Sequence, residues 1–121
     1  MNNVIHWFEI PTANLDRAVK FYETVLGARL KLGTFGQTPQ AMFVGDKDGV
    51  GGALIQDPLR KPSIDGTLVY LDAGKDLDGC IERVVRAGGR VVLPKTDIGE
   101  PGYIAIFADP EGNTVGLHVE R

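Results

Sequence analysis

The stretch NLDRAV at residues 14–19 returns as DLDGCI at residues 76–81, 62 positions further along, and this repeat decides the fold. In each copy a β-prone run precedes a helix N-cap residue, which is Asn14 in the first and Asp76 in the second. Apolar residues then recur at helical spacing until a glycine stops them, and three more β-prone runs follow. The sequence therefore predicts two βαβββ modules.

The boundaries follow from proline, glycine and polar punctuation. Module 1 is predicted over residues 1–57, with strands at 4–10, 29–35, 40–44 and 52–56 and a helix at 15–26. Residues 58–65 read as a polar, proline-containing linker. Module 2 is predicted over residues 66–121, with strands at 67–73, 90–93, 103–108 and 114–119 and a helix at 77–87.

Neither module can bury both faces of its sheet alone, so the two halves are expected to share a core. We predict one α+β domain over residues 1–121, in which the helices cover one face of two paired mixed sheets. The other faces are expected to enclose a shared cleft. The run DPEGN at 109–113 is predicted to be a turn, because proline fixes φ while glycine and asparagine accept positive φ.

Composition and charge argue against several kinds of partner and location for this protein. The net charge of −3, with scattered lysines and arginines, argues against nucleic acid as a partner. The single cysteine, Cys80, fits a buried position in a helix and can form no internal disulfide. No signal peptide and no apolar run long enough for a membrane span is visible, so we expect a cytoplasmic protein without a membrane partner.

Two motifs carry a resemblance. The runs WFEIP at 7–11 and LDRAV at 15–19, and the closing run FADPEGN at 107–113, resemble the two ends of vicinal oxygen chelate proteins. This superfamily holds glyoxalases, bleomycin resistance proteins and extradiol dioxygenases, and the chain is most similar to its glyoxalase-like branch. The resemblance covers nearly the whole chain. It implies a glyoxalase-like fold and a homodimer, but it does not by itself settle function.

The resemblance also implies metal ligands on the first and last strand of each module, facing the cleft. Strand phase places those positions at Trp7, Leu54, Leu68 (or Thr67) and Gly116. None of these side chains is an ordinary donor to a divalent ion. We therefore expect no metal at the family's standard site and no cofactor, so that metal-dependent chemistry is not inherited from the resemblance.

Two residues further along each of these strands, the cleft face is predicted to carry Glu9, Gln56, Tyr70 and His118. One interpretation is a polar rim that orients a small organic ligand, with Trp7 as a stacking surface, Leu54 and Leu68 as floor, and Gly116 leaving room. Another is that Glu9 and His118 form an acid/base pair or a shifted metal site. A third is that they only pair with each other or with the backbone.

The favoured function is therefore a protein of the glyoxalase and bleomycin resistance type that binds a small organic molecule. The alternative is a lyase or isomerase that uses Glu9 or His118 as general base, with or without an atypical metal. A third class, a catalytically silent domain acting through partner proteins, would need a broad exposed apolar patch.

Overall fold

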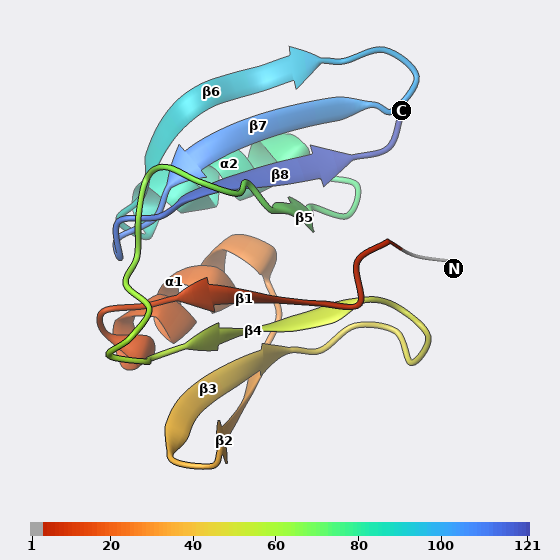
Figure 1. The fold of residues 1–121 in the computed structure, drawn as a ribbon. Helices are drawn as coiled ribbons and strands as arrows, with labels where there is room; N and C mark the ends of the chain where they lie inside the picture. The colour runs from red at the N-terminus through yellow and green to blue at the C-terminus, as the bar shows by residue number, and fades with distance from the viewer. Residues whose placement is uncertain (1–3) are drawn as a thin grey trace.

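The computed structural model describes residues 4–121, in which two βαβββ modules follow one another (Figure 1). The first module contains β1 (Trp7–Pro11), α1 (Leu15–Leu26), β2 (Leu30–Phe35), β3 (Thr38–Phe43) and β4 (Gly51–Ile55). The second contains β5 (Tyr70–Asp72), α2 (Leu77–Arg86), β6 (Arg90–Asp97), β7 (Tyr103–Ala108) and β8 (Thr114–Val119). The predicted order of elements is confirmed.

Each module forms its own four-stranded mixed sheet. The strand orders are β1-β4-β3-β2 and β5-β8-β7-β6, with β1 and β4, and likewise β5 and β8, running parallel. The remaining pairs are antiparallel. The predicted α+β class with two mixed sheets is therefore confirmed. Among residues 4–121 no helix is long and apolar enough to cross a membrane.

Strand β6 is longer than predicted. It continues through Pro94 to Asp97, with irregular register between Leu93 and Thr96. Proline lacks the N–H that an inner strand must donate, but β6 lies at the edge of its sheet, where one side of the strand needs no partner. The irregular register at Pro94 bends the strand without ending it.

Both helices begin at a residue whose side chain caps the first turn, and α1 also ends at a glycine. The Asn14 side chain accepts a hydrogen bond from the Arg17 N–H at 3.1 Å, and Asp76 does the same for Gly79 at 2.9 Å. Helix α1 ends at Gly27, which has a φ of 65° in the left-handed region. Both N-caps predicted from the repeat and the glycine stop of α1 are thus observed, whereas α2 ends at Arg86 with Ala87 as its C-cap, just before the predicted glycine stop.

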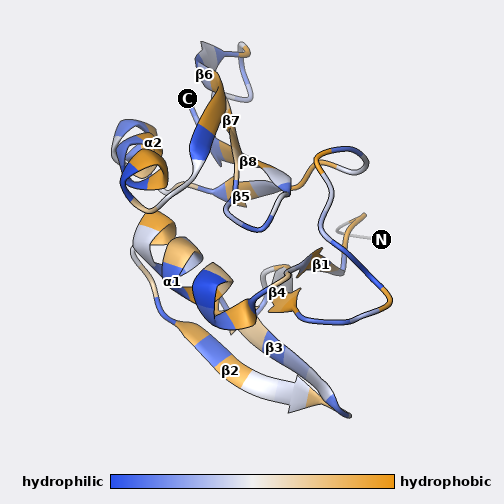
Figure 2. Cartoon of the chain, turned by 90° about the vertical axis from the view of Figure 1, so that its left-hand side faces the viewer, coloured by the Kyte–Doolittle hydropathy of each residue, from blue (hydrophilic) through white to orange (hydrophobic). Residues whose placement is uncertain are grey.

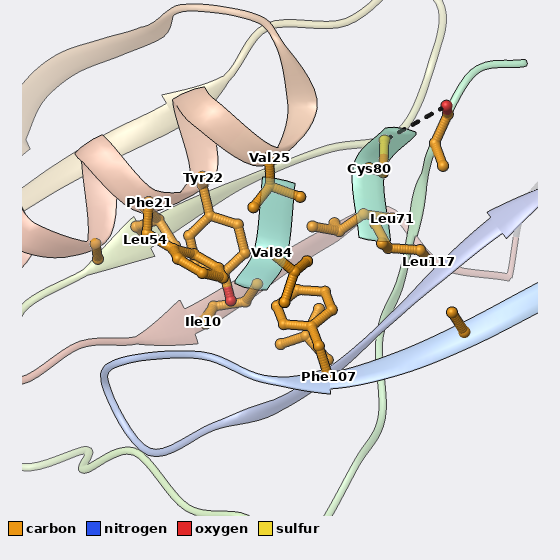
Figure 3. Close-up of a cluster of buried hydrophobic side chains, with 14 of the residues drawn as sticks. Ile10, Phe21, Tyr22, Val25, Leu54, Leu71, Cys80, Val84, Phe107 and Leu117 are labelled. Atoms are coloured by element: carbon orange, nitrogen blue, oxygen red, sulfur yellow. Dashed lines mark hydrogen bonds between the residues drawn. The ribbon is translucent and has the colours of Figure 1, made fainter. Parts of the chain in front are cut away.

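One hydrophobic core joins the modules, and the two helices contact each other within it (Figure 3). Phe21 of α1 packs against Phe107 of β7, with ring centroids 5.7 Å apart, and the Tyr22 ring lies 6.1 Å from the same ring. Cys80 is buried there and lies 3.8 Å from the Ala73 carbonyl, so its predicted core position is confirmed. Neither module has a core of its own in this arrangement.

The helices cover one side of both sheets, and the segment between β4 and β5 crosses the other side (Figure 2). We call the side away from the helices the open face. Ile10 and Leu71 point into the shared core, as predicted, which leaves Trp7 and Tyr70 on the open face. Trp7 is 46% exposed and Tyr70 is 44% exposed, so one chain does not enclose either ring.

The predicted orientation of Leu54 was wrong. Leu54 pairs in register with Ile10 and Ala41, and all three lie in the core under the helices. Since side chains alternate along a strand, Ala53 shares the open face with Glu9 instead. The error is a slip of one residue in β4, which reverses the face of every residue in the strand.

The turn DPEGN ties the start of module 1 to the end of module 2, and we call Asp109, Glu111 and Asn113 the clasp. Glu111, whose side chain is fully buried, accepts hydrogen bonds from the N–H groups of Ala13 at 2.9 Å and Asn14 at 2.7 Å. It also pairs with Arg17. These contacts satisfy orphan donors at the start of α1.

The other two members of the clasp extend the same connection. The Tyr22 hydroxyl donates to Asp109 at 2.6 Å, and the Asn113 amide donates to the Pro11 carbonyl at 2.7 Å. Burial raises the pKa of Tyr22 well above its ordinary value, and neighbouring Asp109 adds to the effect. The predicted turn is therefore also a joint between the modules, built around a neutral phenol and a carboxylate.

Gln56 also serves the start of α1 and does not lie where it was predicted. Its side-chain oxygen accepts a hydrogen bond from the Leu15 N–H at 2.7 Å. Gln56 follows the end of β4 and shares the phase of Leu54, so the same slip of one residue explains why its predicted position on the cleft face was wrong.

Candidate functional site

The open face of the first sheet presents an aromatic platform. The Trp7 indole lies over Gly51, its partner in the β1–β4 register, so closely that a Cβ on Gly51 would approach the ring to 3.3 Å. The glycine lets the ring rest on the strand, while the other side of the ring remains open to solvent. An exposed, supported indole is suited to stacking against a planar or apolar group.

Glu9 stands beside this platform and has two partners. The Trp7 indole N–H donates to one carboxylate oxygen at 3.3 Å, and the Arg60 guanidinium lies 2.7 Å from the other. Arg60 comes from the segment between the modules and also lies 3.5 Å from Asp57. Its bond to Glu9 raises the pKa of Arg60, although burial opposes the shift, so the guanidinium stays charged.

Sequence reasoning missed Arg60. It lies in a predicted linker, 51 positions after Glu9, and a surface arginine in a polar segment carries no pattern that would single it out. Its backbone is fixed by a tight turn, since the Arg60 N–H donates to the Asp57 carbonyl at 3.1 Å and the Leu59 N–H donates to the Asp57 side chain at 2.9 Å. Only the fold brings this turn to β1.

The second sheet repeats the platform. The Tyr70 ring lies over Gly116, its register partner, where a Cβ would fall 2.3 Å from the ring. His118 follows on the same face, and its Nε2 lies 2.6 Å from the Pro101 carbonyl oxygen. Leu68 is half-buried and precedes β5. Each module therefore packs one exposed aromatic ring against a glycine.

Glu9 and His118 do not form a pair within one chain. Glu9 lines a cavity of about 240 Å³ between β1, β8 and the linker, together with Lys61, Asp65 and Asn113. His118 lines a different hollow of about 880 Å³ at the far end of β5 and β8. Each has its own hydrogen-bonding or ion-pair partner and lines its own hollow, so the described residues show no contact between the two.

Comparison with known proteins places the chain in a family. The profile of the Glyoxalase/Bleomycin resistance protein/Dioxygenase superfamily matches residues 4–117. The chain belongs to this superfamily. Among the curated relatives of this chain is the proposed glyoxylase CFP32 of Mycobacterium bovis, whose sequence is 28% identical to it over 117 residues. That match covers 93% of this chain and 44% of CFP32, so the chain spans less than half the length of the relative.

Solved structures of this superfamily share the fold at low sequence identity. A glyoxalase/bleomycin resistance protein from Albidiferax ferrireducens T118 gives a TM-score of 0.73 at 15% identity, covering 95% of this chain and 97% of that one. The corresponding domain from Frankia sp. EAN1pec gives 0.72 at 21%, covering 98% of each chain. The fosfomycin resistance protein FosX of Listeria monocytogenes gives 0.70 at 14%, covering 100% and 93%.

At the positions where the superfamily carries its metal ligands, the side chains of this chain are not suited to bind a metal ion. In the observed register Gly51 of β4 is the counterpart of Gly116 in β8, so the four positions hold Trp7, Gly51, Leu68 and Gly116, none of which offers a donor of the ordinary kind. Among residues 4–121, no group of three or more His, Cys, Asp and Glu side chains is arranged to hold one. We therefore derive no chemical step through a metal.

Proposed function

We propose that this superfamily member binds a small organic molecule on its open faces, with Trp7 and Tyr70 as stacking surfaces. The observation that carries the proposal is the repeated platform, in which an exposed aromatic ring packs closely against a glycine in each module. Large apolar groups left open to water in a regular arrangement commonly mark binding sites. Glu9 and His118 supply polar groups beside the rings, as small-molecule sites require.

The proposed site also includes Leu68 and Gly116. It does not include Leu54, which lies in the core under the helices, or Gln56, whose side chain caps the start of α1. We propose that a second copy of the chain closes the site as a homodimer, since each platform is nearly half exposed in one chain. A monomeric mass in analytical ultracentrifugation, at micromolar protein and with ligand present, would contradict this part. The composition supports action in the cytoplasm.

Trp7 provides the test, because it is the only tryptophan in the chain and its fluorescence reports on this site alone. Titration with small aromatic compounds, beginning with benzyl alcohol, should change the emission and raise the melting temperature. Tyr70→Ala should weaken binding while the fold is retained. Phe35→Ala removes an exposed aromatic ring at the end of β2 and should leave binding unchanged. Equal binding by both variants would refute the platform.

A second candidate function is a lyase or isomerase with Glu9 or His118 acting singly as general base. It is favoured by the position of Glu9 on the wall of a cavity of about 240 Å³, where a carboxylate could meet a small substrate. The test substrate is the hemithioacetal of a 2-oxoaldehyde and a thiol, whose consumption is followed by absorbance. Glu9→Gln or His118→Ala should remove turnover and leave the melting temperature intact, whereas unchanged turnover in both variants would end this candidate.

A further inference from the structure

The polar group beside the Trp7 platform is an ion pair whose two halves differ in how firmly they are held. Glu9 belongs to β1, which is paired along its length with β4, and its side chain is 29% exposed. Arg60 belongs to a turn outside the sheets, and its side chain is 52% exposed. The carboxylate is therefore a fixed feature of the site, while the guanidinium can leave.

The Glu9–Arg60 pair itself is weakly held. Ion pairs open to solvent are worth little, because water screens the attraction and long side chains lose freedom when they are fixed. If Arg60 moves away, Glu9 keeps the hydrogen bond from the Trp7 indole and remains in place on its strand. A competing cation from solution can thus take the same position at low cost.

The local charge balance favours a cation over an anion. Glu9 and Asp57 carry two negative charges against the single positive charge of Arg60. The adjoining cavity adds Lys61 and Asp65, which cancel each other. An anion would have to displace Glu9 from a strand against this net negative charge, whereas a cation only displaces an exposed side chain.

We propose that the ligand carries an ammonium or guanidinium group, which binds the Glu9 carboxylate in place of Arg60 while its apolar part lies on the Trp7 ring. Arg60 is then an internal competitor that occupies the cation position when no ligand is bound. The inference rests on the proposed binding function and specifies the chemical class of the ligand. An indole beside a carboxylate suits such a group, since the ring face also attracts cations.

The experiment compares three probes of one size: benzylammonium, neutral benzyl alcohol and benzoate, each titrated against Trp7 fluorescence. The unaltered chain should bind benzylammonium several-fold more tightly than benzyl alcohol. Arg60→Gln should tighten benzylammonium binding by up to about five-fold and leave benzyl alcohol unchanged, because only the weak internal competitor is lost. Glu9→Gln should abolish the preference. Arg29→Gln, which removes an exposed arginine outside the site, is the matched control.

The outcomes separate this inference from the function on which it rests. Equal affinity for benzylammonium and benzyl alcohol would keep the binding function and refute the cation position. Preference for benzoate that disappears in Arg60→Gln would refute it too, and would make Arg60 an anion receptor. No change of emission with any probe, in any variant whose circular dichroism is native, would contradict both the platform and the cation position.

Discussion

Replacing Glu111 with alanine tests whether the clasp holds the two modules together. The substitution removes the acceptor for the N–H groups of Ala13 and Asn14 and the partner of Arg17. A donor that loses its partner costs about 1–3 kcal/mol, and the low end applies here because Ala13 and Asn14 are exposed and water can replace the carboxylate. The half-exposed pair with Arg17 adds at most about 1 kcal/mol.

The expected loss of unfolding free energy is therefore about 2–3 kcal/mol, which corresponds to a fall in melting temperature of about 8–12 °C for a domain of this size. Urea unfolding and calorimetry measure both quantities. Glu111→Gln keeps one accepting oxygen and should lose about half as much. Glu100→Ala, in an exposed loop, is the control and should melt with the unaltered protein. A Glu111→Ala protein that melts within about 2 °C of that control would refute the reasoning.

Three further predictions concern the same joint and the platforms. Burial alone would raise the pKa of Glu111, but the bonds from Arg17, Asn14 and Ala13 outweigh it and lower the pKa; its charge therefore stabilises the fold above about pH 4.5 and stops doing so as the pH falls. Urea midpoints from neutral to acid pH should fall less steeply in Glu111→Gln, and equal slopes would contradict this. Tyr22→Phe should lower the free energy of unfolding in urea by about 1–2 kcal/mol, because Asp109 loses a buried donor. An unchanged free energy of unfolding would show that this hydrogen bond does not stabilise the fold. Gly116→Ala should keep the fold and displace the Tyr70 ring, so that proton NMR contacts between that ring and the residue 116 backbone disappear.

The phases of β1, β5 and β8 could be predicted because one side of each strand is plainly aliphatic. Ile10, Leu71 and Leu117 alternate with polar or exposed neighbours, and the pattern shows which side meets the helices. Strand β4 offers no such contrast, since Ala53, Leu54 and Ile55 are all buried. Its phase had to be borrowed from the offset between the modules.

The offset of 62 residues between the modules predicts equivalent positions correctly at the helices but wrongly in the last strand of each module. The spacing of 62 residues holds between the N-caps, but Gly51 and Gly116, which occupy equivalent register positions in the two sheets, lie 65 residues apart. Loop lengths and the irregular β6 differ between the modules, and each difference shifts the count. The role of Glu111 was equally out of reach, because its partners at the start of α1 lie 94 to 98 positions away.

The clasp also has a consequence for biosynthesis. A ribosome releases the chain from its N-terminus, so β1 and α1 emerge long before residues 109–113 exist. Until then Ala13 and Asn14 lack their acceptor, the Tyr22 hydroxyl lacks the Asp109 carboxylate, and the apolar face of α1 lacks Phe107. The first module thus reaches its final form only after residues 109–113 have left the ribosome, and until then the apolar face of α1 stays uncovered.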